Sequence, residues 1–184
     1  MLRQFQKRYP GIEVYVDVAA TPNPLPHLLR RALDLGIVSS EPRDSALRFD
    51  PLFEDEMLVV VWRGHPLQKK KFIEPHDLAD ETILIYPPRE ESFLLHRVMR
   101  NIQPRRVIEL PHTEAIIEMI GSRMGVSFMA AWAVRPYLRR GGLIGKRVTR
   151  YGFRRTWQAA TLAAYNKTPA MNELISLIRK AKPK

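Results

Sequence analysis

"SRMGVSFMAAWAVRPYL", residues 122–138, is the stretch that separates two kinds of fold. A helix that ends in Gly-Val-Ser before a second apolar run is typical of a helix-turn-helix, whose second helix reads DNA bases. The same letters also describe a helix that ends, a short buried strand and a further helix. That second arrangement would build one wall of a ligand pocket.

The composition of the second helix favours the pocket wall. A recognition helix needs polar side chains that reach base edges, above all Arg, Asn or Gln. Residues 128–138 offer one Arg, are mostly apolar and contain Pro136, which a helix interior tolerates poorly. Val126 and Phe128 suit a buried strand, and Thr113 suits the N-cap of the preceding helix. We therefore interpret residues 125–130 as a strand.

Strands and helices alternate outward from this segment. Apolar residues alternate over residues 12–19, as a half-buried strand requires, and residues 33–38 form an apolar run typical of a buried parallel strand. Further strands are expected at 47–53, 56–62, 81–86, 105–110, 143–148 and 156–166. Helices are expected at 2–9, 25–33, 91–101, 113–123 and 171–180, and another helix follows the strand at 125–130 and ends at residue 137. This alternation predicts an α/β fold with mostly parallel sheets and helices on both faces.

The composition limits the protein class. Hydrophobic residues make up 45% of the 184 residues, which indicates a globular chain, and the absence of cysteine excludes disulfides and thiolate metal sites. The sequence shows no signal peptide and no apolar run near the ~18 residues that span a bilayer, so we expect a cytoplasmic protein. The formal net charge of +11 favours nucleic acid or anionic small molecules as partners, although it is also compatible with a merely soluble basic surface.

No pattern of catalytic residues is recognisable. The five histidines, at positions 27, 65, 76, 96 and 112, lack the spacing of a zinc motif. Asp77, next to His76, is interpreted as a helix cap. Ser39-Ser40 lacks the G-x-S-x-G context of a nucleophile and is interpreted as the lining of a cleft. We expect no enzyme, no cofactor and no metal.

The densest charge run spans residues 139–155, with seven basic residues and no acidic one. Two interpretations stay open for it. The run forms a solvated rim, or it contacts DNA phosphates or an anionic protein surface.

Several pieces occur in the order seen in LysR-type transcriptional regulators: "FQKRYPGIEV", "LLRRALDLGIVSS", "VVVWRGHPL", "HTEAIIEMIGSRMGVSFMAAW" and "AATLAAYN". Over nearly its whole length the chain resembles the effector-binding domain of that family. The resemblance implies a two-lobed fold like that of type 2 periplasmic binding proteins, with a ligand cleft between the lobes. Lobe I would comprise residues 1–62 and 157–184, and lobe II residues 63–156.

The chain departs from the family pattern in four places. The winged helix-turn-helix with its linker helix, and the first strand of lobe I, have no counterpart in the sequence, so we expect a fragment or a truncated gene product whose DNA contact lies in a domain outside this chain. Arg31 stands where the family usually has Gly, which questions the helix cap there. Ala130-Ala131 replace a common Pro.

Strand ends face the cleft in such folds, which places the effector contacts. The expected effector-binding residues are Thr21, Asn23, Ser39, Ser40, Tyr86, Arg89, Thr113, Phe128, Met129 and Trp132. A helix N-terminus at Thr113 suits a carboxylate, and Arg89 either adds a bidentate contact or is a surface arginine. The resemblance is strongest to family members that respond to homocysteine, which makes homocysteine the first small carboxylate effector to test.

The resemblance also implies a homodimer or tetramer. In that assembly the helix at 25–33 of one chain packs against the helix at 92–99 of another, because each helix has an apolar stripe that a monomer would leave exposed to solvent. An alternative function is a stand-alone binding protein or small enzyme on the same fold.

Overall fold

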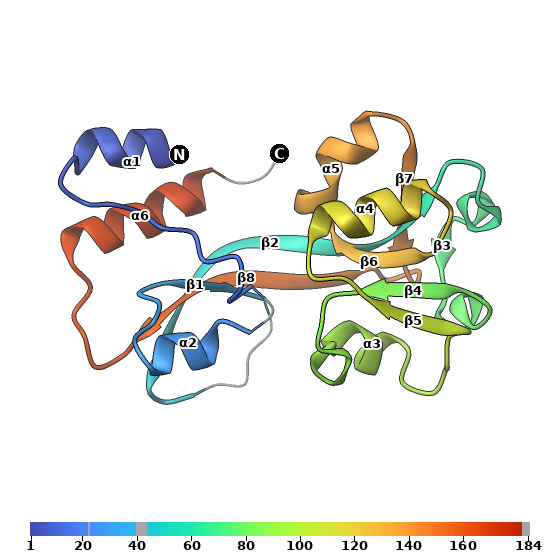
Figure 1. Ribbon diagram of the computed structural model, residues 1–184, viewed down its shortest axis with the longest axis horizontal. Coiled ribbons are helices and arrows are strands. Elements are labelled where there is room, and N and C mark those ends of the chain that lie inside the picture. Colours follow the sequence, from blue (N-terminus) through green and yellow to red (C-terminus); the bar gives the residue numbers. More distant parts are fainter. Residues whose placement is uncertain (22, 40–43, 182–184) are drawn as a thin grey trace. The chain divides into compact units, whose positions relative to one another are not determined.

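The computed structural model describes residues 1–21, 23–39 and 44–181 (Figure 1). The chain divides into two compact units. Unit 1 comprises Met1–Glu54 and Thr156–Lys184, and unit 2 comprises Asp55–Arg155. Two long strands, β2 (Leu47–Trp62) and β8 (Phe153–Leu162), each contribute residues to both units.

The strand expected at residues 125–130 lies inside the sheet of unit 2. β6 (Val126–Ala130) pairs in parallel with β4 (Thr82–Ile85) and antiparallel with β2, with Phe128 opposite Val59. Every residue of β6 is buried, as the apolar run requires for a strand with neighbours on both edges. This confirms the strand interpretation of residues 125–130 and excludes a helix-turn-helix there.

A close backbone approach explains the glycine before β6. A Cβ added at Gly125 would lie 2.6 Å from the carbonyl oxygen of Thr82, closer than real Cβ atoms come. Any larger residue would therefore push β6 away from β4 at the start of their pairing.

In unit 2, one helix precedes β6 in the sequence and another follows it. α4 (Thr113–Gly121) buries Ile116, Ile117 and Ile120, and α5 (Ala131–Arg139) begins directly after the strand. Their apolar side chains pack in one core with residues of the sheet; its buried members are Val60, Leu84, Ile116, Ile117, Ile120, Met129, Val134 and Leu143.

The remaining elements of unit 2 complete the sheet. β5 (Arg106–Glu109) pairs in parallel with β4, β7 (Leu143–Val148) pairs antiparallel with β2, and β3 (Phe72–Ile73) pairs in parallel with β7. α3 (Phe93–Val98) is the third α-helix of this unit. Short 3-10 helices lie at Pro66–Lys69, Pro75–Leu78 and Arg89–Glu91.

Unit 1 packs helices against its own strands. α1 (Leu2–Arg8) and α6 (Pro169–Lys180) bury Phe5 against Ala170 and Leu177. α2 (Leu25–Leu29) buries Leu25 and Leu28 in a separate cluster beside β1 (Gly36–Val38). In the two helices expected to form a dimer contact, several leucines are therefore buried within the chain: Leu25 and Leu28 in α2, and Leu95 in α3.

The strand expected at residues 12–19 is wrong. The segment follows α1 without joining the sheet, and Val16 and Val18 are 73% and 57% exposed. Alternation alone does not make a strand, because the backbone also needs a neighbouring strand for its hydrogen bonds.

Two further expectations differ in detail. Residues 33–38 were expected to form a buried parallel strand, whereas β1 pairs antiparallel with β8 and leaves Ile37 45% exposed. Residues 47–53 and 56–62 form the single strand β2. The α/β class is confirmed, but the sheet is mixed and not mostly parallel: the pairs β3–β7, β4–β5 and β4–β6 are parallel, whereas β1–β8, β2–β6 and β2–β7 are antiparallel. Among the described residues, no helix combines the length and the apolar character needed to cross a membrane.

Candidate functional site

A pair of hydroxyl groups lies at the carboxyl end of β4 in unit 2. Tyr86 directly follows β4, Thr113 is the first residue of α4, and their side-chain oxygens are 2.6 Å apart. Burial raises the pKa of the Tyr86 hydroxyl, and the hydrogen bond with Thr113 opposes this effect. The structure thus brings together two residues that the sequence placed near an effector.

The N-terminus of α4 differs from the expectation in one respect. The N-cap is His112, not Thr113, and its side chain makes no capping hydrogen bond. The first-turn N–H groups therefore have no cap from that side chain, and the helix dipole favours negative charge beside them. The Thr113 hydroxyl, released from capping, is what reaches Tyr86.

A carboxylate occupies the corresponding position at α5. Asp55 Oδ1 accepts a hydrogen bond of 3.2 Å from the backbone N–H of Trp132 in the first turn of that helix. Its second oxygen, Oδ2, is buried and has no hydrogen-bond partner within the described residues. Burial raises the pKa of Asp55, opposed by the N–H groups of Glu56 and Trp132 and then by the charge of Arg155.

The charge of Arg155 interacts with both Asp55 and Tyr86. Burial lowers the pKa of its guanidinium to about 10, and the charges of Asp55 and Tyr86 oppose that shift. A cation that has lost much of its hydration is a good partner for a carboxylate, which can form two parallel hydrogen bonds with a guanidinium. The group of Asp55, Tyr86, Thr113, Trp132 and Arg155, which we call the anion group, therefore combines a desolvated cation with a hydrogen-bonded pair of hydroxyls.

Neither Asp55 nor Arg155 was identified from the sequence. Arg155 is the last of seven basic residues in the run 139–155, so nothing in the sequence distinguishes it from the others. Asp55, with which its charge interacts, lies 100 residues earlier in the chain. A signal does exist for Asp55: it stands with Glu56 inside a strand that is otherwise apolar from Met57 to Trp62. Charged residues in such a strand need a local partner.

The predicted residues of β6 divide between two faces. Successive side chains of a strand point in opposite directions, so Phe128 and Met129 cannot line the same wall. Met129 packs in the core of unit 2. Phe128 is 6% exposed, whereas Trp132 on α5 is half-buried.

The other predicted residues make no recorded contact with the anion group within unit 2, belong to unit 1, or lie outside the described residues. The side chain of Arg89 is exposed, and its backbone N–H donates to Glu109 at 3.2 Å. Thr21, Asn23 and Ser39 belong to unit 1, where Thr21 is exposed and the other two are half-buried. Ser40 lies outside the described residues. The assignment of all these residues to an effector stays a prediction.

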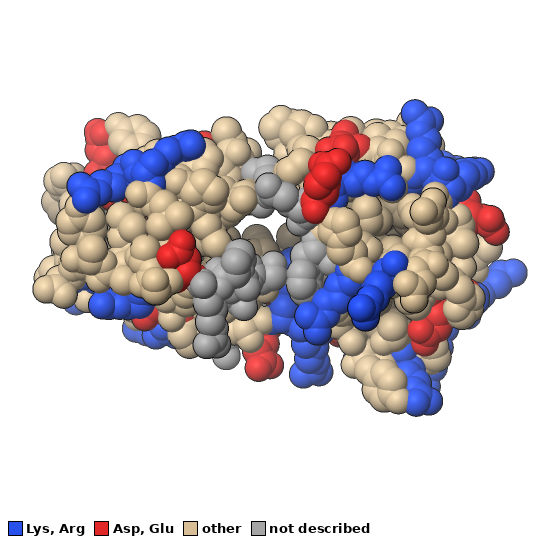
Figure 2. Space-filling view, turned by 90° about the horizontal axis from the view of Figure 1, so that it is seen from below, with Lys and Arg blue, Asp and Glu red and all other residues tan. Residues whose placement is uncertain are grey.

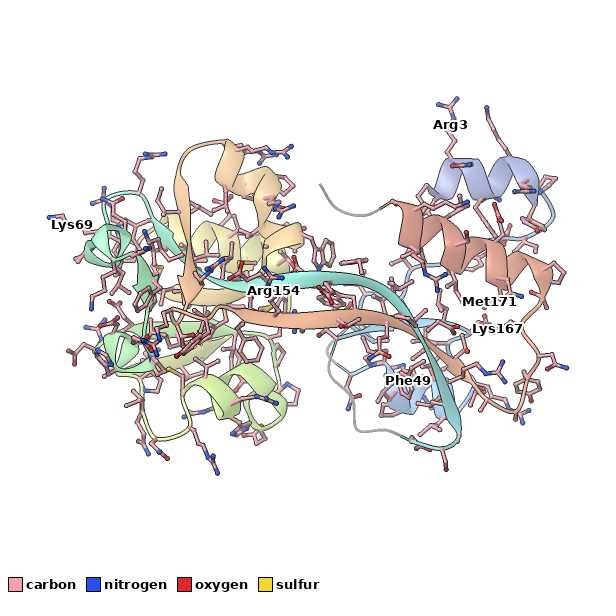
Figure 3. All side chains as sticks on the ribbon, turned by 180° about the vertical axis from the view of Figure 1, so that it is seen from behind. Arg3, Phe49, Lys69, Arg154, Lys167 and Met171 are labelled. Atoms are coloured by element: carbon pink, nitrogen blue, oxygen red, sulfur yellow. The ribbon has the colours of Figure 1, made fainter. Side chains whose placement is uncertain are left out.

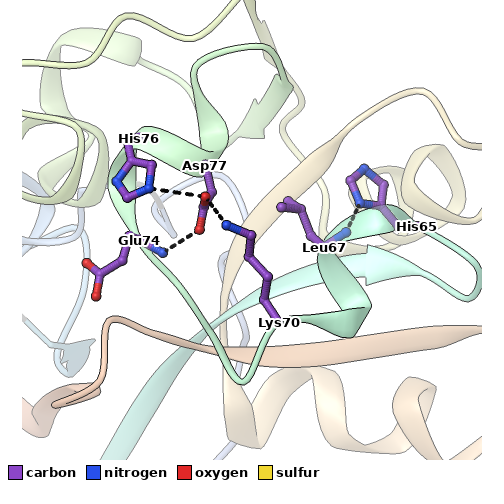
Figure 4. A network of polar contacts seen from close by, with 6 residues as sticks. All are labelled: His65, Leu67, Lys70, Glu74, His76 and Asp77. Carbon is purple, nitrogen blue, oxygen red and sulfur yellow. Dashed lines mark hydrogen bonds and ion pairs between the residues drawn. The ribbon is translucent and has the colours of Figure 1, made fainter.

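The histidines that might suggest catalysis have structural contacts instead. His65 is buried, and its Nδ1 accepts from the backbone N–H of Leu67 at 3.1 Å (Figure 4). Its Nε2 lies 3.3 Å from Glu81. Asp77 binds Lys70 and the backbone N–H of Glu74, and so caps the 3-10 helix Pro75–Leu78. In the described part of the chain, no group of three or more His, Asp or Glu side chains could hold a metal ion.

The whole chain matches one protein family. Residues 1–183 fit the LysR substrate binding domain. The HTH-type transcriptional regulator MetR of Escherichia coli K12 is 33% identical over 149 residues, which is 79% of this chain and 46% of the relative. CbbR of Rhodospirillum rubrum is 26% identical over 184 residues, 98% of this chain and 61% of the relative.

Solved structures agree with this match. The regulatory domain of MetR from N. meningitidis superposes with a TM-score of 0.81 at 29% identity, covering 97% of this chain and 84% of that one. The regulatory domain of CcmR from Synechocystis, in complex with 2-PG, gives a TM-score of 0.80 at 26% identity, covering 97% and 88%.

These relatives are named as transcriptional regulators and not as enzymes, and the chain spans about half the length of the MetR proteins it matches. The match over residues 1–183 and the likeness to the MetR regulatory domain agree on one family. This chain belongs to the LysR substrate-binding domain family.

Proposed function

We propose that the chain is the effector-sensing domain of a DNA-binding transcription regulator, and that unit 2 holds the anionic end of a small carboxylate effector at the anion group. The observation that carries the proposal is the hydroxyl pair of Tyr86 and Thr113 at the N-terminus of α4, electrostatically coupled to the partly buried Arg155. Units 1 and 2 correspond to lobes I and II of the type 2 periplasmic-binding-protein fold in this proposal.

Charge balance supports an anionic ligand. The pKa of Arg155 is lowered because burial penalises its charge, and the opposing Asp55 has a raised pKa for the same reason. A carboxylate beside Arg155 would supply hydrogen bonds in place of lost water. One hydroxyl of the Tyr86–Thr113 pair donates to the other, which leaves one O–H for the anion, and the first turn of α4 adds backbone N–H donors.

The residues near the anion group suggest the rest of the ligand. Trp132 is half-buried at the start of α5 and offers an apolar surface, whereas Met129 is already used by the core. A short apolar or sulfur-containing tail fits this surface. Homocysteine is the first compound to test, because the sequence resembles family members that respond to it.

Calorimetry tests the proposal with homocysteine, methionine and simple dicarboxylates as separate ligands. For a ligand that binds, Arg155→Gln should weaken affinity by roughly 10- to 100-fold, because a charge-assisted hydrogen bond contributes about 1.5–3 kcal/mol. Thr113→Val and Tyr86→Phe should each weaken it by a few-fold, on the order of one neutral hydrogen bond.

Arg106→Gln provides the matched control. Arg106 is exposed at the first residue of β5, at the opposite end of that strand from Glu109, and its loss should leave affinity unchanged. Arg89→Gln decides whether that arginine belongs to the site. If Thr113→Val and Arg155→Gln both bind the ligand as tightly as the unaltered chain, the anion group is not the effector site.

A further inference from the structure

The basic run at residues 139–155 is not used by the anion group, apart from Arg155. On the face shown in Figure 2, Lys and Arg side chains gather over unit 2. Four arginines of the run have exposed side chains: Arg139, Arg140, Arg150 and Arg154. Within the described residues, no ion pair involves any of these four.

The first two arginines lie at one end of β7. Arg139 ends α5 and Arg140 is its C-cap. The adjacent backbone is held by Arg63, whose N–H donates to Gly142 at 2.9 Å and whose guanidinium donates to Gly141. Arg63 is itself exposed, so it adds a third guanidinium at this end.

The other two arginines lie at the opposite end of β7. Arg150 is in the turn between β7 and β8, with its guanidinium 4.5 Å from the ring centre of the exposed Tyr151. Arg154 lies near the start of β8 and is labelled in Figure 3. Arg147, in contrast, is bound to Glu56 at 2.8 Å, which largely neutralises its charge.

The spacing of the two arginine groups points to an extended partner. A strand rises about 3.3 Å per residue, so the six residues of β7 hold the groups roughly 20 Å apart. A small anion binds where charges converge, whereas duplex DNA presents about one negative charge per 1.7 Å of its axis. The surface therefore matches a charged polymer.

We infer that this surface, defined by Arg139, Arg140, Arg150 and Arg154 and called the β7 arginine surface, contacts the phosphate backbone of duplex DNA. Duplex DNA is chosen over single strands because Tyr151 is the exposed aromatic residue of the run, and single-strand binding needs several stacking rings. The contact is independent of sequence, since arginines on phosphates carry no base information. The choice of DNA over other polyanions rests on the proposed function.

Fluorescence anisotropy of the chain with a labelled duplex of arbitrary sequence tests the inference across a salt series. The fourfold variant Arg139→Gln, Arg140→Gln, Arg150→Gln, Arg154→Gln should reduce the slope of log affinity against log salt by about 3 to 4, because each lost phosphate contact removes roughly 0.9. Near 50 mM salt this variant should bind at least about tenfold more weakly.

A charge-matched control separates a defined surface from net charge. The control removes four exposed basic residues of unit 1 by changing Arg3, Lys7, Arg48 and Lys180 to Gln. Arg3, on α1, is labelled in Figure 3. The control should lower the slope by less than about 1, and a variant with Lys at the four arginine positions should retain binding, since phosphate attraction requires only the charge.

Several outcomes would overturn the inference. These are equal losses in the fourfold variant and the control, no binding of the unaltered chain at low salt, or tighter binding of single-stranded RNA or polyphosphate than of duplex DNA. Effector calorimetry on the same fourfold variant keeps the two proposals distinct. Ligand binding there should be unchanged, so either proposal can fail while the other stands.

Discussion

Arginine occupies a left-handed backbone conformation at the ends of two helices. Arg31 follows α2 with φ 61° and Arg123 follows α4 with φ 64°. In each case the two closing hydrogen bonds are those of a Schellman motif, for example Met124 N–H to Met119 O and Arg123 N–H to Ile120 O, both 3.0 Å. The motif prefers Gly at this position because a Cβ is strained there.

Arg123→Gly should therefore stabilise the chain. Relief of the left-handed strain contributes about 1–2 kcal/mol, and the greater flexibility of Gly in the unfolded chain removes about 0.5–1 kcal/mol, so the free energy of unfolding should rise by about 0.5–1 kcal/mol. Denaturant unfolding measures it. Arg140→Gly is the control, since Arg140 has φ −72° and should lose stability. Equal losses in both variants would show that Arg123 is not strained.

Asp77 should make the stability of unit 2 depend on pH. Burial alone would raise the pKa of this carboxyl, but Lys70, the Glu74 N–H and His76 together lower it (Figure 4). A carboxyl whose folded pKa is lowered stabilises the fold at pH values above its unfolded pKa. This contribution is lost as the pH falls from about 4 through the folded pKa.

Asp77→Asn should therefore cost about 1–2 kcal/mol of unfolding free energy at neutral pH and less in acid. Denaturant unfolding at several pH values measures the difference. Asp80→Asn, which alters an exposed carboxylate two residues beyond the same 3-10 helix, should change little at any pH. A constant cost of Asp77→Asn from neutral pH down to pH values near 2 would contradict the assigned role of the charge.

At the scale of elements, the extended segment after α1 shows that an alternating pattern of apolar residues does not by itself make those residues buried. Val14 packs against the cluster around Phe5, whereas Val16 and Val18 of the same alternating series are exposed. The series therefore does not share one buried face.

Replacing Val16 and Val18 together by Lys should leave the free energy of unfolding within about 0.5 kcal/mol, because exposed side chains lose no packing. The same variant should bind less of a dye that reports exposed apolar surface. Val14→Lys, in contrast, should destabilise by about 1–3 kcal/mol. Comparable destabilisation in both variants would mean that residues 12–18 are packed as a strand in solution.

A strand can be predicted from the sequence only when its backbone also finds a neighbouring strand for its hydrogen bonds. β6 was predicted because an apolar run after Gly125 must be buried on both faces, and the structure confirms it. The strand predicted at residues 12–19 was wrong, because pairing depends on a neighbouring strand that periodicity does not reveal. The candidate site follows the same rule. Tyr86 directly follows β4 and Thr113 begins α4, and both were predicted from these element ends, whereas the charge interaction between Asp55 and Arg155 joins residues far apart in the sequence.

At the scale of the whole molecule, several apolar side chains that the sequence assigned to a self-association surface are buried within the chain. Leu25 and Leu28 of α2 are buried within unit 1, and Leu95 and Met99 are buried in unit 2. Leu29 of α2 is the leucine of that stripe that stays exposed, at 43%. If α2 mediates the dimer that the LysR family resemblance implies, Leu29 must lie at its contact.

Sedimentation of the chain should therefore show a dimer at concentrations in the range of tens of micromolar, an order typical of weak specific contacts. Leu29→Glu should shift the chain to a monomer, because the interface would then bury an unpaired charge. Ile37→Glu changes a residue of similar exposure on β1, outside α2, and should leave the dimer intact. A monomer in the unaltered chain, or a dimer that survives Leu29→Glu and is lost in Ile37→Glu, would place self-association away from α2.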